Sequence, residues 1–370
     1  FEPMASISKI LKVGIRCLAI TAGFFLIFRT GHSIKTFDLL ITIIGIALVF
    51  DSEARILLKK IWPQIWPYLK YFIAIIALVI LAQVISYLKN QNTVFDSELA
   101  TNYGRIIFNV YVLFLTAFLI YYDRKILLLL SLSIFLSSFV NLPAYWKLEE
   151  RAYLYGGRLT GSLQSPLILG LWMTIVFLIG IGLFMIAKKT WAKIPLAISL
   201  IIVASFLLWT SSRAAWLALA FSLLLWLLFY LQKKDWRKLT NFILISTISL
   251  FLGYLILPHK QLQVKDFVRE RVSNFSHSLI TLQPSSVESQ SQIRLWPGVT
   301  DFVIHHPLGS GFGLYAKEQL ILKIGDTIST NSFLELGLYG GIGAILIFLA
   351  TLFKLGKRAV VAIKTYTPGF

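Results

Sequence analysis

Long apolar runs separated by short basic connections constrain the fold of this chain more than any other feature of its sequence. A helix needs roughly 17–25 mostly apolar residues to cross the hydrocarbon core of a bilayer, which is about 30 Å thick. Such runs lie near residues 11–28, 37–50, 66–87, 105–122, 126–144, 164–187, 194–209, 214–231, 240–257 and 333–353. Of all residues 14% are charged, whereas a soluble domain has about 25%. The sequence therefore predicts an all-α integral membrane protein with about ten transmembrane helices.

The distribution of lysine and arginine predicts the orientation of these helices. Basic residues gather before the first run and in every second connection after it, for example in the connections that hold Arg124 and Lys188. Short cytoplasmic loops carry this excess of positive charge in multi-pass proteins, so we expect the N-terminus to be cytoplasmic. The net charge of +18 is spread over these connections rather than gathered in one patch. We therefore expect no nucleic-acid partner.

One connection on the predicted outer side is long enough to form a small domain. We divide the chain into nine transmembrane helices in 4–257, a helical extracytoplasmic loop domain in 258–329, and a last transmembrane helix with a cytoplasmic tail in 330–370. Near the start of the loop domain, apolar residues recur at helical spacing between basic ones, which predicts an amphipathic helix on the membrane surface. These apolar residues are Val264, Phe267, Val268, Val272 and Phe275.

Four arginines on the predicted outer side are candidates for binding an anionic substrate. Arg213 follows two serines and begins the next apolar run at once, which holds a guanidinium at the edge of the hydrocarbon. A charged group there normally has a partner or a task, although an arginine that reaches lipid phosphates is the alternative. Guanidinium suits pyrophosphate because it donates bidentate hydrogen bonds and stays charged. Arg158 follows two glycines, Arg105 opens the fourth span, and Arg294 lies in the loop domain.

Candidate proton acceptors lie near the last span. Glu335, just inside that span, is either a general base or an acid in the first helical turn, where the helix dipole favours it. Thr330 or Asn331 would then cap the helix. His305 and His306 precede a proline, which indicates the end of a helix. Since no other histidine or cysteine stands at ligand spacing, we expect no metal, and without a nucleotide-binding motif we expect no cofactor.

Six short tracts follow one another within roughly residues 155–350. They are Arg158-Leu159-Thr160-Gly161, Ser211-Ser212-Arg213-Ala214-Ala215-Trp216, Ile293-Arg294-Leu295-Trp296, His306-Pro307-Leu308-Gly309-Ser310-Gly311-Phe312-Gly313, Thr330-Asn331-Ser332-Phe333-Leu334-Glu335 and Gly340-Gly341-Ile342-Gly343. Their order resembles the bacterial O-antigen ligase and O-antigen polymerase superfamily, whose members are polytopic enzymes that handle undecaprenyl-pyrophosphate-linked glycans outside the inner membrane. Each tract alone is a weak signal, and their order and spacing together are fairly specific.

The resemblance implies a glycosyltransferase that needs no nucleotide sugar and no cofactor. An acceptor hydroxyl would attack the anomeric carbon of a glycan carried on undecaprenyl pyrophosphate. Arg213 and Arg294 match the family's two arginine positions and would stabilise the leaving pyrophosphate. The expected partners are this lipid-linked donor, a glycan or lipid-linked acceptor, membrane lipid, and a protein that regulates chain length. The expected location is the bacterial inner (plasma) membrane, with the active face on the periplasmic side.

One departure from the family pattern bears on the reaction. Ligases of the superfamily usually have a histidine immediately before the asparagine that precedes the last helix, where this chain has Thr330. Threonine does not accept a proton at neutral pH as imidazole does. We therefore favour a polymerase that joins lipid-linked repeat units, with Glu335, His305 or His306 as the base. The alternatives are a ligase that transfers finished polysaccharide to lipid A-core or another surface acceptor, and, from another class, a small-anion transporter.

Overall fold

The computed structural model describes residues 2–27, 31–88, 97–142, 159, 166–257, 269, 273, 300–311 and 332–365. For some helical residues, among them Arg213 and residues 332–335, it describes the backbone alone. Within these ranges all regular secondary structure is helical, which confirms the all-α prediction. The chain forms two compact units: the first unit is Phe1–Glu53 with Leu119–Thr281, and the second unit is Ala54–Phe118 with Leu282–Phe370.

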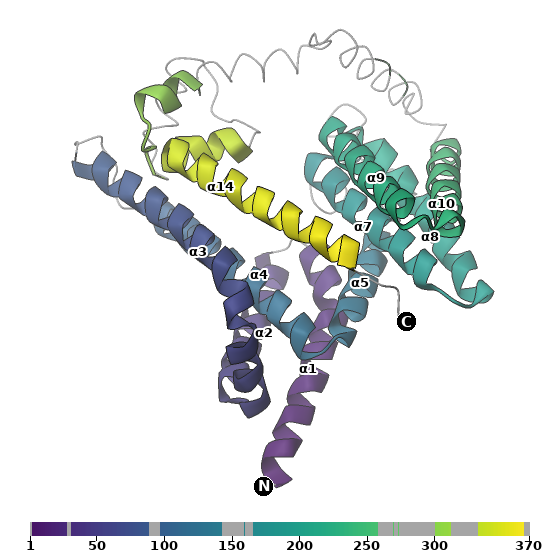
Figure 1. The fold of residues 1–370 in the computed structure, drawn as a ribbon, viewed down its shortest axis with the longest axis horizontal. Helices are drawn as coiled ribbons and strands as arrows, with labels where there is room; N and C mark the ends of the chain where they lie inside the picture. The colour runs from purple at the N-terminus through teal and green to yellow at the C-terminus, as the bar shows by residue number, and fades with distance from the viewer. Residues whose placement is uncertain are drawn as a thin grey trace. The chain divides into compact units, whose positions relative to one another are not determined.

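The first unit is a bundle of helices, some of which are joined by very short turns (Figure 1). Its helices are α1 (Glu2–Ile27), α2 (Gly31–Phe50), α5 (Lys125–Ser137), the 3-10 helix η1 (Ser138–Asn141), α7 (Pro166–Ile186), α8 (Thr190–Thr210), α9 (Arg213–Lys233) and α10 (Trp236–Leu255). Two residues separate α8 from α9, and two separate α9 from α10. In each turn the first residue is left-handed and the side chain of the second accepts a hydrogen bond from the backbone of the next helix. Each turn thereby ends one helix and caps the next.

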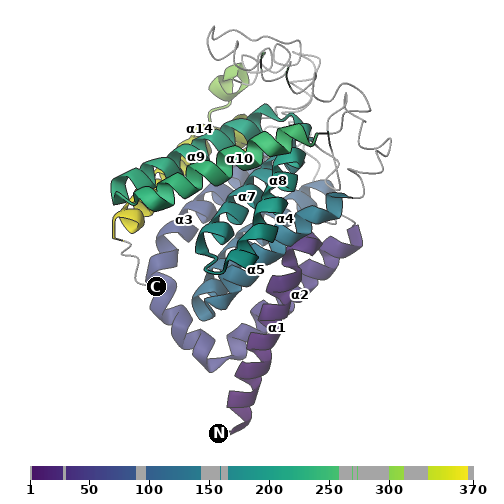
Figure 2. The same ribbon diagram turned by 90° about the vertical axis from the view of Figure 1, so that its right-hand side faces the viewer.

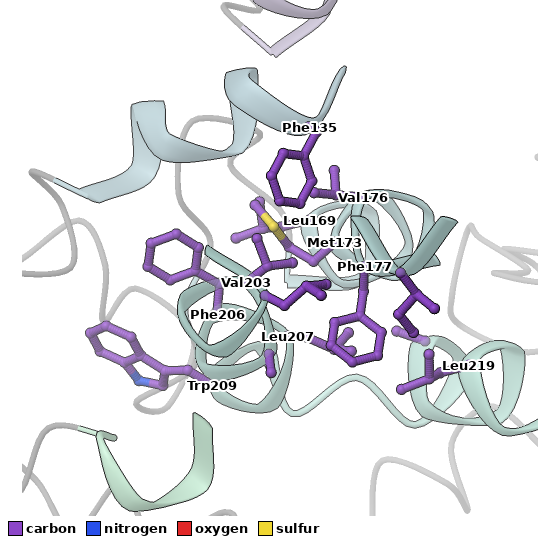
Figure 3. Packing of buried hydrophobic residues seen from close by; sticks show 14 of the residues in the cluster. Phe135, Leu169, Met173, Val176, Phe177, Val203, Phe206, Leu207, Trp209 and Leu219 are labelled. Carbon is purple, nitrogen blue, oxygen red and sulfur yellow. The ribbon is translucent and has the colours of Figure 1, made fainter. Parts of the chain in front are cut away.

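A tightly packed apolar core holds α7 and α8 together (Figure 3). Met173 and Phe177 of α7 and Phe206 of α8 have no solvent-exposed surface. Gly180 allows this packing, because a Cβ there would lie 2.5 Å from a ring carbon of Phe135 on α5. In the most apolar 18-residue stretch of each helix, 44% is buried in α7 and 11% in α9. Helix α7 is therefore covered by protein to a greater extent than α9, whose apolar surface is largely left for lipid.

Ion pairs attach α1 to the ends of neighbouring helices. Arg16 donates from Nε to Asp123 Oδ2 at 2.6 Å. One turn earlier, Lys12 donates from Nζ to Glu53 Oε2 at 2.8 Å. Asp123 lies between α4 and α5, where it also accepts a hydrogen bond from the backbone of Lys125. Partial burial alone would raise the pKa of Asp123, but the hydrogen bonds from Arg16 and Lys125 lower it below its ordinary value. Asp123 is therefore ionised at neutral pH and ties α1 to the α4–α5 connection.

The second unit is built around two long helices. It contains most of α3 (Ser52–Leu88) and of α4 (Ser97–Tyr122), a short helical segment at 300–305, and α14 (Ser332–Thr365). Helix α3 has 37 residues and carries Pro63 and Pro67 inside it. Proline removes a backbone hydrogen bond and bends a helix, and α3 curves along its length in Figure 2. Helix α14 contains a break at Gly341, where φ is 69° and ψ is −171°.

Seven described helices are long and apolar enough to cross a membrane: α3, α4, α7, α8, α9, α10 and α14. The apolar helices Phe37–Phe50 and Lys125–Asn141 are shorter. These helices fit a multi-pass membrane protein, whereas the predicted count of about ten spans is not confirmed. Each of the ten predicted runs nevertheless coincides with a described helix. The predicted loop domain, 258–329, is described at Arg269, at Ser273 and at 300–311, and the rest of it lies outside the described residues.

Candidate functional site

The turn between α8 and α9 brings Arg213 to the start of a helix. Ser211 ends α8 in the left-handed conformation, with φ 49° and ψ 33°, and Ser212 is extended. Arg213 is the first residue of α9, as expected if almost no loop joins these two runs. Non-glycine residues adopt the left-handed conformation at a cost of about 1–2 kcal/mol. The fixed position of Arg213 therefore depends on the packing that holds Ser211 in place.

The first turn of α9 offers positive potential as well as the arginine. The Ser212 side chain accepts a hydrogen bond from the backbone of Ala215 at 3.4 Å, and its carbonyl accepts one from Trp216 at 3.0 Å. The first N–H groups of a helix have no partner inside it and carry a partial positive charge. Such a helix start binds phosphate-like anions. Arg213 thus begins a helix whose own backbone already favours an anion at this end.

Close packing from α7 supports the turn. Gly170 lies against it, because a Cβ there would be 2.9 Å from atoms of Thr210, Ser212 and Ala215. The hydroxyl of Thr174 lies 3.0 Å from the carbonyl oxygen of Gly170 and 3.2 Å from that of Ala215. These contacts leave the turn with almost no exposed surface, and they keep water away from the backbone that positions Arg213.

Two tryptophans near this turn have indole N–H groups without a described partner. The Nε1 atoms of Trp172 on α7 and Trp216 on α9 are buried and make no hydrogen bond in the part of the chain that the structure describes. A buried donor without a partner costs free energy. Nothing in the sequence distinguishes these two tryptophans, because they lie in apolar runs among other large side chains. They are candidate donors to a substrate oxygen.

Leu159, the residue that follows Arg158, is bonded to the end of α8 just before the same turn. Leu159 has no exposed surface, and its N–H donates to the carbonyl of Trp209 at 3.2 Å. Arg158 itself lies outside the described residues, as do Arg294, Thr330 and Asn331. Of the remaining candidates, Arg105 is an exposed residue of α4, and Glu335 lies in the first turn of α14, described by its backbone alone.

Asp301, His305 and His306 lie on or next to the short helix at 300–305. His305 Nδ1 is 2.8 Å from the carbonyl oxygen of Asp301 and 3.2 Å from its carboxylate. Both oxygens accept hydrogen bonds, so this geometry places a proton on Nδ1, and in the neutral ring Nε2 then carries the lone pair. The His305 side chain is 69% exposed. The His306 ring packs on Phe302 instead, with centroids 4.4 Å apart. His305 therefore presents a basic nitrogen outward, while His306 takes part in packing.

Residues 307–311 fill the break in α14. The carbonyl of Leu338 accepts from Ser310 N–H at 2.9 Å and from Ser310 Oγ at 3.0 Å, and Gly311 N–H bonds the carbonyl of Tyr339. Ile342 N–H in turn donates to the carbonyl of Pro307 at 3.0 Å. The backbone groups released by the break are thus bonded by a loop rather than by water, as a helix in a membrane requires.

The match to the family model described as O-antigen ligase covers residues 198–349. Residues 198–349 are thus similar to this family, and we call them the O-antigen ligase segment. The resemblance to the O-antigen ligase and polymerase superfamily is thereby confirmed, and the family implies a glycosyltransferase-like membrane enzyme that uses lipid-linked glycans. Among the candidate site residues, Arg105 and Arg158 fall outside the O-antigen ligase segment. No curated protein and no solved structure matches the chain significantly.

We predict that Gly341→Ala loosens the O-antigen ligase segment at the break. At φ 69° and ψ −171°, where almost only glycine is found, a side chain costs about 1–3 kcal/mol. The added Cβ would also overlap the carbonyl oxygen of Pro307. Thermal unfolding in detergent should show a lower midpoint, and amide exchange at Ser310 and Gly311 should become faster.

Gly356→Ala is the matched control for this prediction. It lies in the same helix with nothing within 4 Å of an added Cβ, so alanine there should be neutral or stabilising by up to about 1 kcal/mol. If the two variants unfold at the same midpoint temperature, the contacts of residues 307–311 do not depend on glycine at the break, and the prediction is wrong.

Proposed function

We propose that this chain polymerises undecaprenyl-pyrophosphate-linked repeat units into surface polysaccharide at the periplasmic face of the bacterial inner membrane. The observation that carries the proposal is the start of α9 within the O-antigen ligase segment. There a two-residue turn, a helix N-terminus and Arg213 coincide. A polymerase of this kind has to bind a lipid pyrophosphate at the membrane edge, and this arrangement favours an anion there. The basic connections of the sequence support a cytoplasmic N-terminus.

In the proposed reaction an acceptor hydroxyl attacks the anomeric carbon of the donor glycan. The new glycosidic bond forms as the bond from the anomeric carbon to the pyrophosphate oxygen breaks. The hydroxyl proton goes to a base of the protein, and undecaprenyl pyrophosphate leaves with the bonding electrons. Arg213 and Arg294 stabilise the charge that grows on the leaving group. Arg158 adds positive charge, a role supported by the bond between its neighbour Leu159 and the end of α8.

The base proposed from the described geometry is His305. Its Nδ1 faces two acceptor oxygens of Asp301, which leaves Nε2 able to take a proton. Within the described residues Nε2 has no hydrogen-bond partner. This histidine would supply the function that Thr330 lacks, with Thr330 and Asn331 orienting the acceptor. Glu335 is the alternative base, and the backbone position of Glu335 in the first turn of α14 is compatible with either role.

A ligase is the second candidate function, because the matching family model is described as O-antigen ligase. A ligase would use the same donor and leaving group but a different acceptor, such as lipid A-core. Thr330 argues against this reaction, since superfamily ligases usually have a histidine there. The acceptor requirement separates the two functions.

The first experiment supplies undecaprenyl-pyrophosphate-linked repeat unit as the sole sugar to purified protein in nanodiscs. A ladder of longer lipid-linked chains, resolved by gel or mass spectrometry, is the expected product. If product forms only after lipid A-core is added, the protein is a ligase and the polymerase proposal is wrong. Absence of product under both conditions, with an active relative as positive control, would contradict both functions.

Arg213→Ala and Arg294→Ala should each lower the rate of chain growth about 10²–10³-fold, the usual loss when one stabilising donor is removed from a developing anion. The matched control is Arg237→Ala, an exposed arginine at the start of α10 with the same charge. Size-exclusion elution should stay unchanged for all three variants. Wild-type rates for Arg213→Ala would exclude a role for this residue at the pyrophosphate.

His305→Gln and Glu335→Gln, measured in the same assay, identify the base. Loss of a general base lowers the rate about 10²–10⁴-fold, and we expect this loss for His305→Gln. Asp301→Asn should give a smaller loss, because it weakens the orientation of the imidazole and leaves Nε2 in place. A large loss in Glu335→Gln together with a normal rate in His305→Gln would assign the base to Glu335 instead.

A further inference from the structure

Three cationic side chains of the second unit gather around two tyrosines. Lys354 Nζ of α14 lies 5.6 Å from the ring centroid of Tyr68 and 5.2 Å from that of Tyr71, both on α3. The guanidinium carbon of Arg358 is 5.1 Å from the Tyr68 ring, and Lys70 Nζ is 5.5 Å from the Tyr71 ring. Each distance is within the range of a cation–π interaction. We call these five residues the basic–tyrosine cluster.

The cluster has no counter-ion among the described residues. The ion pairs that the structure describes involve other lysines, arginines and histidines, and none includes Lys70, Lys354 or Arg358. Lys354 and Arg358 are four residues apart on one helix, a spacing at which like charges repel. Tyrosine rings offset a part of this repulsion, because the face of the ring is negative. The charge of the cluster is therefore available to an external anion.

The hydroxyl of Tyr68 adds a second and independent sign of a ligand. Its oxygen is buried and has no hydrogen-bond partner in the described part of the chain. A buried hydroxyl without a partner is unfavourable and rare in native structures. It lies on the ring that both Lys354 and Arg358 contact. An oxygen of an anion bound by these two cations would accept the missing hydrogen bond.

The surroundings of the cluster indicate the kind of anion. Lys354 and Arg358 lie at the end of the spanning part of α14, Leu336–Arg358. On α3, Trp62 and Trp66 stack with centroids 5.7 Å apart and are 43% and 45% exposed. Tryptophans and basic residues concentrate where a membrane meets water. Ile73, on the apolar side of the cluster along α3, is 47% exposed and offers a surface for an acyl chain.

We propose that the basic–tyrosine cluster binds the phosphate headgroup of an anionic phospholipid. The phosphate oxygens accept hydrogen bonds from Lys354, Arg358 and the Tyr68 hydroxyl, while an acyl chain lies along the exposed apolar face of α3. Basic pockets between transmembrane helices bind anionic headgroups in this way. The bound lipid offsets the repulsion between Lys354 and Arg358 and connects α14 to α3. This site is independent of the proposed glycosyl transfer.

The test titrates phosphatidylglycerol into the detergent-purified protein and counts bound lipids by native mass spectrometry, with phosphatidylcholine for comparison. Wild type should retain phosphatidylglycerol preferentially. The double variant Lys354→Gln/Arg358→Gln should lose about tenfold or more in apparent affinity. The matched control is Lys357→Gln, an exposed lysine between them on the same helix, which should change affinity by less than about twofold. If Lys357→Gln lowers the affinity for phosphatidylglycerol as much as the double variant does, the attraction is nonspecific and the proposal is wrong.

Two further measurements keep the test decisive. Tyr68→Phe removes one oxygen and keeps the ring, so it preserves packing even if the double variant does not fold. It should weaken phosphatidylglycerol binding roughly two- to tenfold, the usual effect of one hydrogen bond, and unchanged binding would contradict the proposed role of the hydroxyl and with it the site. If millimolar inorganic phosphate displaces the lipid, the cluster binds a free anion and the lipid proposal is wrong.

Discussion

Backbone hydrogen bonding in a medium without water governs the structure of this chain. An N–H or C=O group inside hydrocarbon has no solvent partner, so nearly every one has to be bonded within the protein. The two-residue turns of the first unit follow from this requirement, because Ser212 and Asp235 cap the next helix at once. The break at Gly341 follows it as well, since Ser310 and Gly311 bond the carbonyls of Leu338 and Tyr339. At these turns and at this break, a side chain or a neighbouring segment supplies the hydrogen bonds that the irregular backbone lacks.

The sequence was sufficient for features that depend on local pattern. Apolar length located all ten helical runs, and the serines before Arg213 indicated an immediate restart of the helix. That pattern does not decide how many of these helices span the bilayer. The helix Lys125–Asn141, for example, is apolar but shorter than the seven that are long enough to cross. The α3 helix exceeds its predicted run, 66–87, by more than ten residues at its start. This extension contains Pro63, and Pro67 follows it, so both prolines lie inside one continuous helix.

Tertiary partners account for what local pattern did not indicate. The unpartnered indoles of Trp172 and Trp216 are recognisable only when their surroundings are known. Likewise, Gly341 belongs to a tract of several glycines, and nothing in their spacing distinguishes the one that breaks the helix. Its importance comes from Pro307, which lies more than thirty residues earlier in the chain and occupies the space that a side chain would need. Residues 307–311 of the family tract thereby acquire a structural role in addition to any chemical one.

This arrangement also bears on how the chain manages without the usual histidine at position 330. His305 lies at the end of the short helix at 300–305, and Glu335 lies in the first turn of α14. The bonds of Ser310 and Gly311 to α14 fix these two segments relative to each other within the second unit. A base carried by either segment therefore has a defined position, which general base catalysis requires. In the proposed reaction, in which His305 rather than residue 330 takes the proton, the bonds near Gly341 hold the short helix at 300–305 in place against α14.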